Sequence, residues 1–230
     1  MKRLKDIVFW AGILIIILTS VLIKPLSNLD EIWNFNIARE IANGLVPYKD
    51  ISMITTPLLS FVTAIFLKIF GTEMFVTRIL ATILAVINLS LIYVILRKLK
   101  LGKIFAMLFV FGITVMLRNY FCLDYNFLVL TFTLLIILIE LEPHRKDSIK
   151  SHILVGILGG LAFCTKQSIG ALICVVIILN NLFFIKNKSE LKKSLKYIMY
   201  RAIGILSPIA IFIVYLLIAG AFGDFFDYCI

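Results

Sequence analysis

The sequence predicts an all-α fold, a polytopic bundle of about seven transmembrane helices with amphipathic juxtamembrane helices in its first outer loop. Of its 230 residues, 62% are hydrophobic and 16% are charged, and the mean hydropathy is +1.07. A soluble domain is about 45–50% apolar and about 25% charged. The apolar residues form long continuous runs, which indicates helices. Helices also satisfy backbone polar groups internally, as lipid requires.

Eight apolar runs can be read along the chain, at 7–26, 57–70, 78–96, 104–117, 125–141, 153–164, 169–185 and 202–221. A helix needs roughly 20 residues to cross a hydrocarbon core of about 30 Å. The run 57–70 would be only about 21 Å long at 1.5 Å per residue. We interpret it as an interfacial or re-entrant helix, with Thr56 as N-cap, Pro57 as first helical residue and Gly71 as its stop.

Loop charge sets the expected orientation. With 57–70 left out of the count and a cytoplasmic N-terminus, seven spans place every strongly basic segment in the cytoplasm. These segments hold 16 of the 23 lysines and arginines and are 1–6, 97–103, 142–152 and 186–201. Eight spans would put 97–103 and 186–196 outside. We therefore expect a multi-pass protein of the cell (inner) membrane, with 28–77 as its first outer loop.

The distribution of charge and the spacing of the cysteines indicate which ligands the chain binds. The net charge of +10 comes from short loops between apolar runs, which is typical of contact with anionic lipid rather than with nucleic acid. The four cysteines lack metal-ligand spacing. No cofactor is predicted, and a metal held by the hard carboxylates of the outer loops stays an open alternative. His144 and His152 share a basic loop, and we expect both to be solvated.

Acidic residues at the outer ends of the runs are the first candidates for chemistry, because ionisable groups near a membrane are costly and often functional. Asp30 and Glu31 follow the first run, and Asp124 opens the run 125–141. Asp30 is predicted to cap an amphipathic helix from Glu31 to Asn43, which has Glu31 and Asn34 on its polar side and Gly44 as its stop. Asp124 is also a potential cap. Two acids from separate loops suit a base and an orienting group.

Basic residues near the outer face are the second set of candidates. Lys166 interrupts an apolar hairpin at 159–170, and Arg78 and Arg118 lie at the outer ends of their spans. Each is a possible cation for a lipid phosphate. The alternative for Lys166 is an interfacial lysine that extends its amine to the surface. Gly159 and its neighbour Gly160 permit close helix packing.

Several motifs follow one another in a particular order. They are Leu29-Asp30-Glu31, Ala38-Arg39-Glu40-Ile41-Ala42-Asn43-Gly44, Pro47-Tyr48-Lys49-Asp50-Ile51, Thr56-Pro57-Leu58-Leu59, Phe70-Gly71, Leu123-Asp124 and Thr165-Lys166-Gln167. In order and spacing this set resembles the GT-C membrane glycosyltransferases, most closely the branch with the protein mannosyltransferases and the lipid A aminoarabinose transferase. The resemblance extends over nearly the whole chain.

The resemblance implies a hexosyltransferase that moves a sugar from a polyprenyl-phosphate carrier to a glycan, lipid or protein acceptor. Transfer would take place on the outer face by inverting displacement. Asp30 matches the family's first-loop acid, which acts as base or orients the acceptor, and Asp124 matches its second acid. Glu31, next to Asp30, is counted with them as a catalytic residue. Lys166 matches a lysine near the carrier phosphate. The residues assigned to that phosphate are Lys166, Gln167, Arg78 and Arg118.

Family members are longer than this chain. The resemblance therefore implies one GT-C-like domain over 1–230, equivalent to an N-terminal membrane portion and incomplete at its C-terminus. Two other functions remain open, a truncated non-catalytic remnant or scaffold, and a membrane transporter. Transporters tend to carry internal repeats and interrupted helices at mid-membrane, whereas the acids here lie at the ends of spans.

Overall fold

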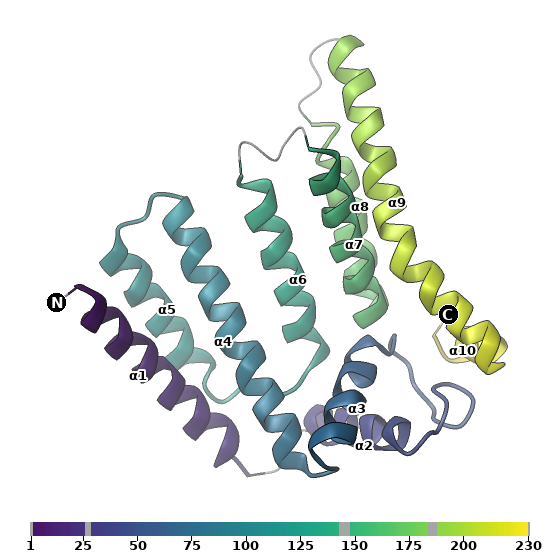
Figure 1. Cartoon of the computed structure of the whole chain (residues 1–230), viewed down its shortest axis with the longest axis horizontal. Coiled ribbons are helices and arrows are strands. Elements are labelled where there is room, and N and C mark those ends of the chain that lie inside the picture. Colours follow the sequence, from purple (N-terminus) through teal and green to yellow (C-terminus); the bar gives the residue numbers. More distant parts are fainter. Residues whose placement is uncertain (1, 26–28, 143–147, 184–187, 230) are drawn as a thin grey trace. The chain divides into compact units, whose positions relative to one another are not determined.

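The computed structural model describes residues 2–25, 29–142, 148–183 and 188–229. Within these ranges the chain forms ten α-helices joined by turns and loops (Figure 1). They are α1 (Lys2–Leu22), α2 (Leu29–Ala42), α3 (Leu58–Phe70), α4 (Met74–Lys98), α5 (Lys103–Leu117), α6 (Tyr125–Glu140), α7 (Ile149–Thr165), α8 (Gln167–Leu179), α9 (Lys188–Ala219) and α10 (Phe222–Cys229). The prediction of an all-helical fold is confirmed, and each of the eight apolar runs contains the greater part of one helix.

Three of the described helices are long and apolar enough to cross a membrane. They are α1 from Leu4 onward, α4 and α9, with 19, 25 and 32 residues. Five shorter apolar helices are α3, α5, α6, α7 and α8. These helices support the expectation of a membrane protein, whereas the number of spans and the single-domain organisation stay predictions.

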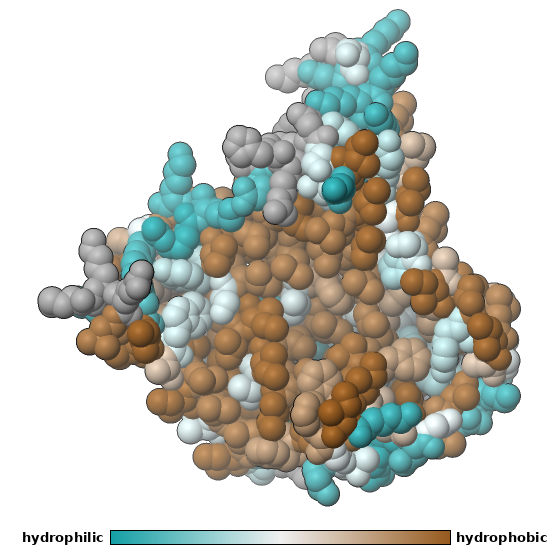
Figure 2. All heavy atoms as spheres, in the orientation of Figure 1, coloured by the Kyte–Doolittle hydropathy of each residue, from teal (hydrophilic) through white to brown (hydrophobic). Residues whose placement is uncertain are grey.

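Large apolar side chains point outward from the helices. On the face shown in Figure 2, hydrophobic residues cover most of the visible surface. Ile104, Met116 and Ile218 have exposed fractions of 72%, 78% and 83%. Apolar surface on this scale is not tolerated by a monomer in water, whereas it is favourable against lipid tails. The surface therefore agrees with the composition.

The chain divides into two compact units, the first of which comprises Met1–Ala42 and Ser60–Phe127. Its helices α1, α4 and α5 pack against one another. Ala38 of α2, Leu67 of α3 and Val76 of α4 form a buried cluster that attaches the two short helices to the start of α4. Gly71 ends α3 as predicted, with φ +103° and its N–H bonded to Leu67 O at 3.0 Å.

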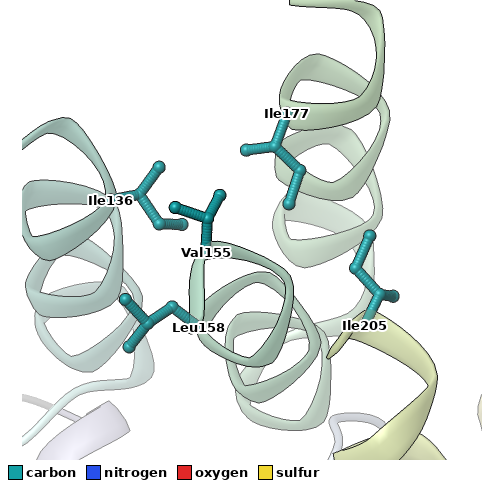
Figure 3. Close-up of a cluster of buried hydrophobic side chains, with 5 residues drawn as sticks. All are labelled: Ile136, Val155, Leu158, Ile177 and Ile205. Atoms are coloured by element: carbon teal, nitrogen blue, oxygen red, sulfur yellow. The ribbon is translucent and has the colours of Figure 1, made fainter. Parts of the chain in front are cut away.

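The second unit comprises Asn43–Leu59 and Leu128–Ile230. Helix α7 packs along α9 and against α8. Buried side chains from α6, α7, α8 and α9 point toward one another in Figure 3, and they are Ile136, Val155, Leu158, Ile177 and Ile205. Glycines bring α7 and α9 close: a Cβ on Gly160 would lie 2.4 Å from Ile205 O. The predicted close packing at this glycine is therefore confirmed.

A buried arginine joins four helices of the second unit. Arg201 is 2% exposed, forms an ion pair with Glu140, and donates to Ile177 O and to His152 Nδ1, the last at 3.1 Å. His152 is 5% exposed, so the prediction of a solvated side chain is wrong for it. The physical reason is that a buried guanidinium needs a full set of acceptors. His144 lies outside the described residues.

The loop between α2 and α3 is anchored by one aromatic side chain. Tyr48 has φ +71°, a strained value for this residue type, and is only 1% exposed. Its hydroxyl donates to Thr55 O at 2.8 Å. Its ring meets Phe225 of α10 edge to face, with centroids 5.1 Å apart. Burial and the hydrogen bond together fix this loop against α10, within the second unit.

The α7–α9 contact yields a stability prediction. A Cβ on Gly156 would lie 2.2 Å from Arg201 O and 2.9 Å from Gly204 Cα. Gly156→Ala should therefore force the helices apart and cost about 1–3 kcal/mol of unfolding free energy. The measurement is the thermal midpoint of the purified protein in detergent. Gly112→Ala is the matched control, because its Cβ would meet no atom within 4 Å. Equal midpoints for the two variants would contradict the described packing.

Candidate functional site

The first two acids lie inside the first turn of α2. This helix begins at Leu29, so the prediction that Asp30 precedes the helix as its N-cap is wrong. Asp30 is exposed, and a carboxylate in the first turn interacts favourably with the helix dipole. Helix α2 ends at Ala42, and Gly44 follows with φ +99°, as predicted for a stop.

Helix α2 buries polar residues on its inner face. Glu31 and Asn34 are buried together with Ile37 and Ala38. The prediction that Glu31 and Asn34 lie on the polar side is therefore wrong. Burial of a polar group is costly unless the group is hydrogen-bonded. The partners of these two side chains therefore show which parts of the chain α2 is fixed to.

Glu31 is paired with Arg78 of α4. Arg78 Nε donates to Glu31 Oε1 at 3.0 Å, and the two side chains are 11% and 3% exposed. Arg78 Nη1 donates to Leu22 O at 3.2 Å. The arginine thus links the end of α1 with the beginnings of α2 and α4. Among the described residues, Glu31 Oε2 and Arg78 Nη2 have no hydrogen-bond partner.

Asn34 connects α2 to the segment that carries the third acid. Its Nδ2 donates to Asp30 O at 2.9 Å and to Leu123 O at 3.3 Å. The rings of Trp33 and Tyr125 meet edge to face nearby, with centroids 6.2 Å apart. The first turn of α2 is therefore fixed against the segment just before α6.

Asp124 is the N-cap of α6. Its Oδ1 accepts from the Asn126 backbone N–H at 3.3 Å, and its Oδ2 accepts from Asn126 Nδ2 at 2.7 Å. The alternative of a cap is thereby confirmed for this acid. A cap fixes the carboxylate at the positive end of the helix, and this role is compatible with chemistry at the same carboxylate.

Cys122 reports the convergence of the three acids. Burial raises the pKa of its thiol to about 12, and the negative charges of Asp124, Glu31 and Asp30 contribute to the same shift. Lys24 acts in the opposite direction. Charges influence a thiol in this way only from nearby. The hydrogen bonds from Asn34 to Asp30 O and to Leu123 O show the same proximity, so the structure brings together three acids that the sequence supplies from two separate segments.

The remaining candidates are placed differently. Arg118 is exposed at the C-cap of α5. Lys166 and Gln167 belong to the second unit, where Lys166 separates α7 from α8 with extended backbone, φ −152° and ψ 105°. The Lys166 side chain is half-buried.

Gln167 is engaged by the loop before α3. Its Nε2 donates to Ile54 O at 2.7 Å, and its Oε1 accepts from Thr56 N at 3.2 Å. Thr56 donates from its hydroxyl to Phe163 O at 2.7 Å. Because α3 begins at Leu58, the prediction that Thr56 caps it is wrong, and its hydroxyl serves the end of α7 instead. This arrangement was not visible in the sequence, since 111 residues separate Thr56 from Gln167.

An apolar cavity of about 440 Å³ lies beside this turn in the second unit. Its wall includes Phe163, Gln167, Ser168, Phe212, Leu216 and Phe225. Within the described ranges, no group of three or more histidine, cysteine, aspartate or glutamate side chains is arranged to hold a metal ion.

Comparison with known protein families gives a match over most of the chain. The model of the family described as dolichyl-phosphate-mannose-protein mannosyltransferase matches residues 55–215, well over half of the chain. The matched range includes Arg78, Asp124 and Lys166 and begins after Asp30. Neither the comparison with curated proteins nor that with solved structures gave a match.

The acid cluster predicts the reactivity of Cys122. A thiol reacts as its thiolate, so the raised pKa keeps Cys122 unreactive at pH 9 and lets its reaction accelerate as the pH approaches 12. Asp124→Asn keeps a good cap but removes a negative charge. It should lower the thiol pKa and speed alkylation at a fixed pH, measured by mass spectrometry of Cys122.

Glu40→Gln is the control for this experiment, because it neutralises a carboxylate further along the same helix. It should leave the pH dependence of Cys122 alkylation unchanged. The same profile for wild type and Asp124→Asn would show that the charge of Asp124 does not act on the thiol.

Proposed function

The chain belongs to the dolichyl-phosphate-mannose-protein mannosyltransferase family, and from this premise we propose that it moves a sugar from a polyprenyl-phosphate carrier to an acceptor. The family makes it a membrane glycosyltransferase of the GT-C type. The observation that carries the finer proposal is that Asn34 bonds to both Asp30 O and Leu123 O, which brings Asp30, Glu31 and Asp124 together. Such a cluster supplies the base that an attacking hydroxyl requires.

The proposed reaction is one inverting displacement. The Asp30 carboxylate takes the proton of the acceptor hydroxyl, whose oxygen attacks the anomeric carbon of the donor sugar. The bond from that carbon to the carrier phosphate oxygen breaks, and polyprenyl phosphate leaves with the bonding electrons. Asp30 suits the base because it is exposed. Asp124, held by Asn126, suits the acid that orients the acceptor.

Glu31 supports the site rather than exchanging protons. It was predicted among the catalytic residues, but its carboxylate is 3% exposed and paired with Arg78. We propose that this ion pair fixes the first turn of α2. Arg78, predicted to bind phosphate, is thereby engaged by Glu31 and Leu22 O, so its contribution to the site is to hold this acid.

We propose that Lys166 binds the phosphate of the carrier in the second unit. A leaving phosphate gains most from a cation at a fixed position, and the turn that carries Lys166 is held by Gln167 and Thr56. The apolar cavity beside this turn suits the first isoprene units of the carrier. Gln167 then acts by fixing the turn, and Arg118 remains a candidate cation.

The membrane arrangement is part of the same proposal. Helix α3 has 13 residues, about 20 Å at 1.5 Å per residue, which is short of a hydrocarbon core of about 30 Å. Helix α8 is equally short, so the choice of α3 as the helix that does not span rests on the charge of the loops. We propose that α2 and α3 lie at the outer surface as juxtamembrane helices of the loop 28–77. Seven spans then leave the N-terminus in the cytoplasm and the acids on the outer face.

The catalytic proposal predicts the effect of Asp30→Asn. Membranes containing the protein are incubated with a radiolabelled polyprenyl-phosphate sugar, and labelled product is measured over time. Loss of the base should lower the rate by about 10²- to 10⁴-fold. Glu73→Gln is the control, an exposed outer-loop carboxylate that makes no side-chain cap hydrogen bond. Normal transfer by an equally inserted Asp30→Asn protein would exclude the catalytic role.

The phosphate-binding proposal predicts the effect of Lys166→Gln. Loss of a charge-assisted hydrogen bond should raise the KM for the donor about tenfold or more. Lys68→Gln is the matched control, since Lys68 is exposed in the last turn of α3. An unchanged donor KM in initial-rate measurements on Lys166→Gln would remove this residue from the proposed site.

A further inference from the structure

Asn34 lies between the two segments that carry the acids. It is 1% exposed, and its Nδ2 reaches both Asp30 O within α2 and Leu123 O at the residue before Asp124. Asparagine has a low helix propensity, and burial of its amide is costly unless it is bonded. The side chain therefore needs a specific reason to occupy the buried face of α2.

The segment that Asn34 contacts is itself buried. Phe121, Cys122 and Leu123 have exposed fractions of 3%, 5% and 2%. A hydrogen bond to the Leu123 carbonyl thus reaches Asp124 through one peptide unit. The same amide also donates to the carbonyl of Asp30. Asn34 therefore holds the backbone of one acid directly and that of the other through the residue before it.

Apolar contacts alone do not determine this arrangement. The cluster of Ala38, Leu67 and Val76 and the ring contact of Trp33 with Tyr125 keep α2 in place. Such contacts are not directional, so they tolerate small rotation of the helix. A hydrogen bond requires a defined distance and angle. The bond from Asn34 to Leu123 O therefore fixes the first turn against the segment before α6, as the Glu31–Arg78 ion pair fixes it against α4.

Resting on the proposed function, we propose that Asn34 is a positioning residue of the acidic site. Its amide sets the distance between the turn that carries Asp30 and the segment that ends at Asp124. Misplacement of a reacting group by about 1 Å costs about 10²-fold in rate. The effect should appear in kcat rather than in the donor KM, because Asn34 acts on the acids.

The test compares Asn34→Ala and Asn34→Leu with Asn36→Ala. Asn34→Leu keeps a branched side chain of similar size and removes the amide donor without adding a charge, so it is the variant to use if Asn34→Ala does not insert into the membrane. Asn36 is half-buried on the same helix and is the control. Both Asn34 variants should lower kcat about 10²-fold with the donor KM unchanged, whereas Asn36→Ala should keep wild-type kinetics.

A second readout does not depend on activity. If Asn34 holds the two segments together, its loss should loosen the surroundings of Cys122 and speed alkylation of that thiol at pH 9. Wild-type kcat in inserted Asn34 variants, or a lowered kcat with unchanged Cys122 alkylation, would overturn the positioning role. Absence of transfer by the wild-type protein would instead contradict the proposed function, so the two failures are distinguishable.

Discussion

The polar contacts on the buried face of α2 are the interactions on which the acidic site depends. Glu31 and Asn34 are placed where neither lipid nor water can satisfy them, so they require partners within the chain. Arg78 supplies one partner and the Leu123 carbonyl supplies the other. Because these partners belong to α4 and to the segment before α6, the two contacts bring the first turn of α2, the start of α4 and the segment that ends at Asp124 together.

Asp30 and Asp124 differ in how their surroundings hold them, and this difference suits a division of roles. Asp124 is tied to Asn126 through both carboxylate oxygens, which restricts its motion. Asp30 is exposed in the first turn of α2, where an incoming hydroxyl has access to it. In the second unit the turn at Lys166 is held by Gln167 and Thr56 in a comparable way. Each proposed functional group therefore stands on a helix end or turn that neighbouring polar contacts keep rigid.

Local patterns in the sequence predict the helices well and their long-range partners poorly. Continuous apolar runs locate all eight apolar helices, and Gly44 and Gly71 end α2 and α3 as expected from their freedom at positive φ. Periodicity misplaces Asn34 and Glu31 because their partners lie 89 and 47 residues away. The buried His152 is missed for the same reason, since its partner Arg201 is 49 residues away. Motif order identifies the candidate acids, but only the fold brings Asp30 and Glu31 to the segment that carries Cys122 and Asp124.

The most direct test of the account is a double-mutant cycle on the transfer rate with Asp30→Asn and Asp124→Asn. Residues that act as one unit are strongly non-additive. The account predicts that the double variant is no slower than the slower single variant. Once one of the two acids has lost its function, the other no longer contributes to the rate, so its substitution has no further effect. Independent losses that multiply, or an Asp124→Asn protein with the wild-type rate, would contradict the claim that the two acids form one site.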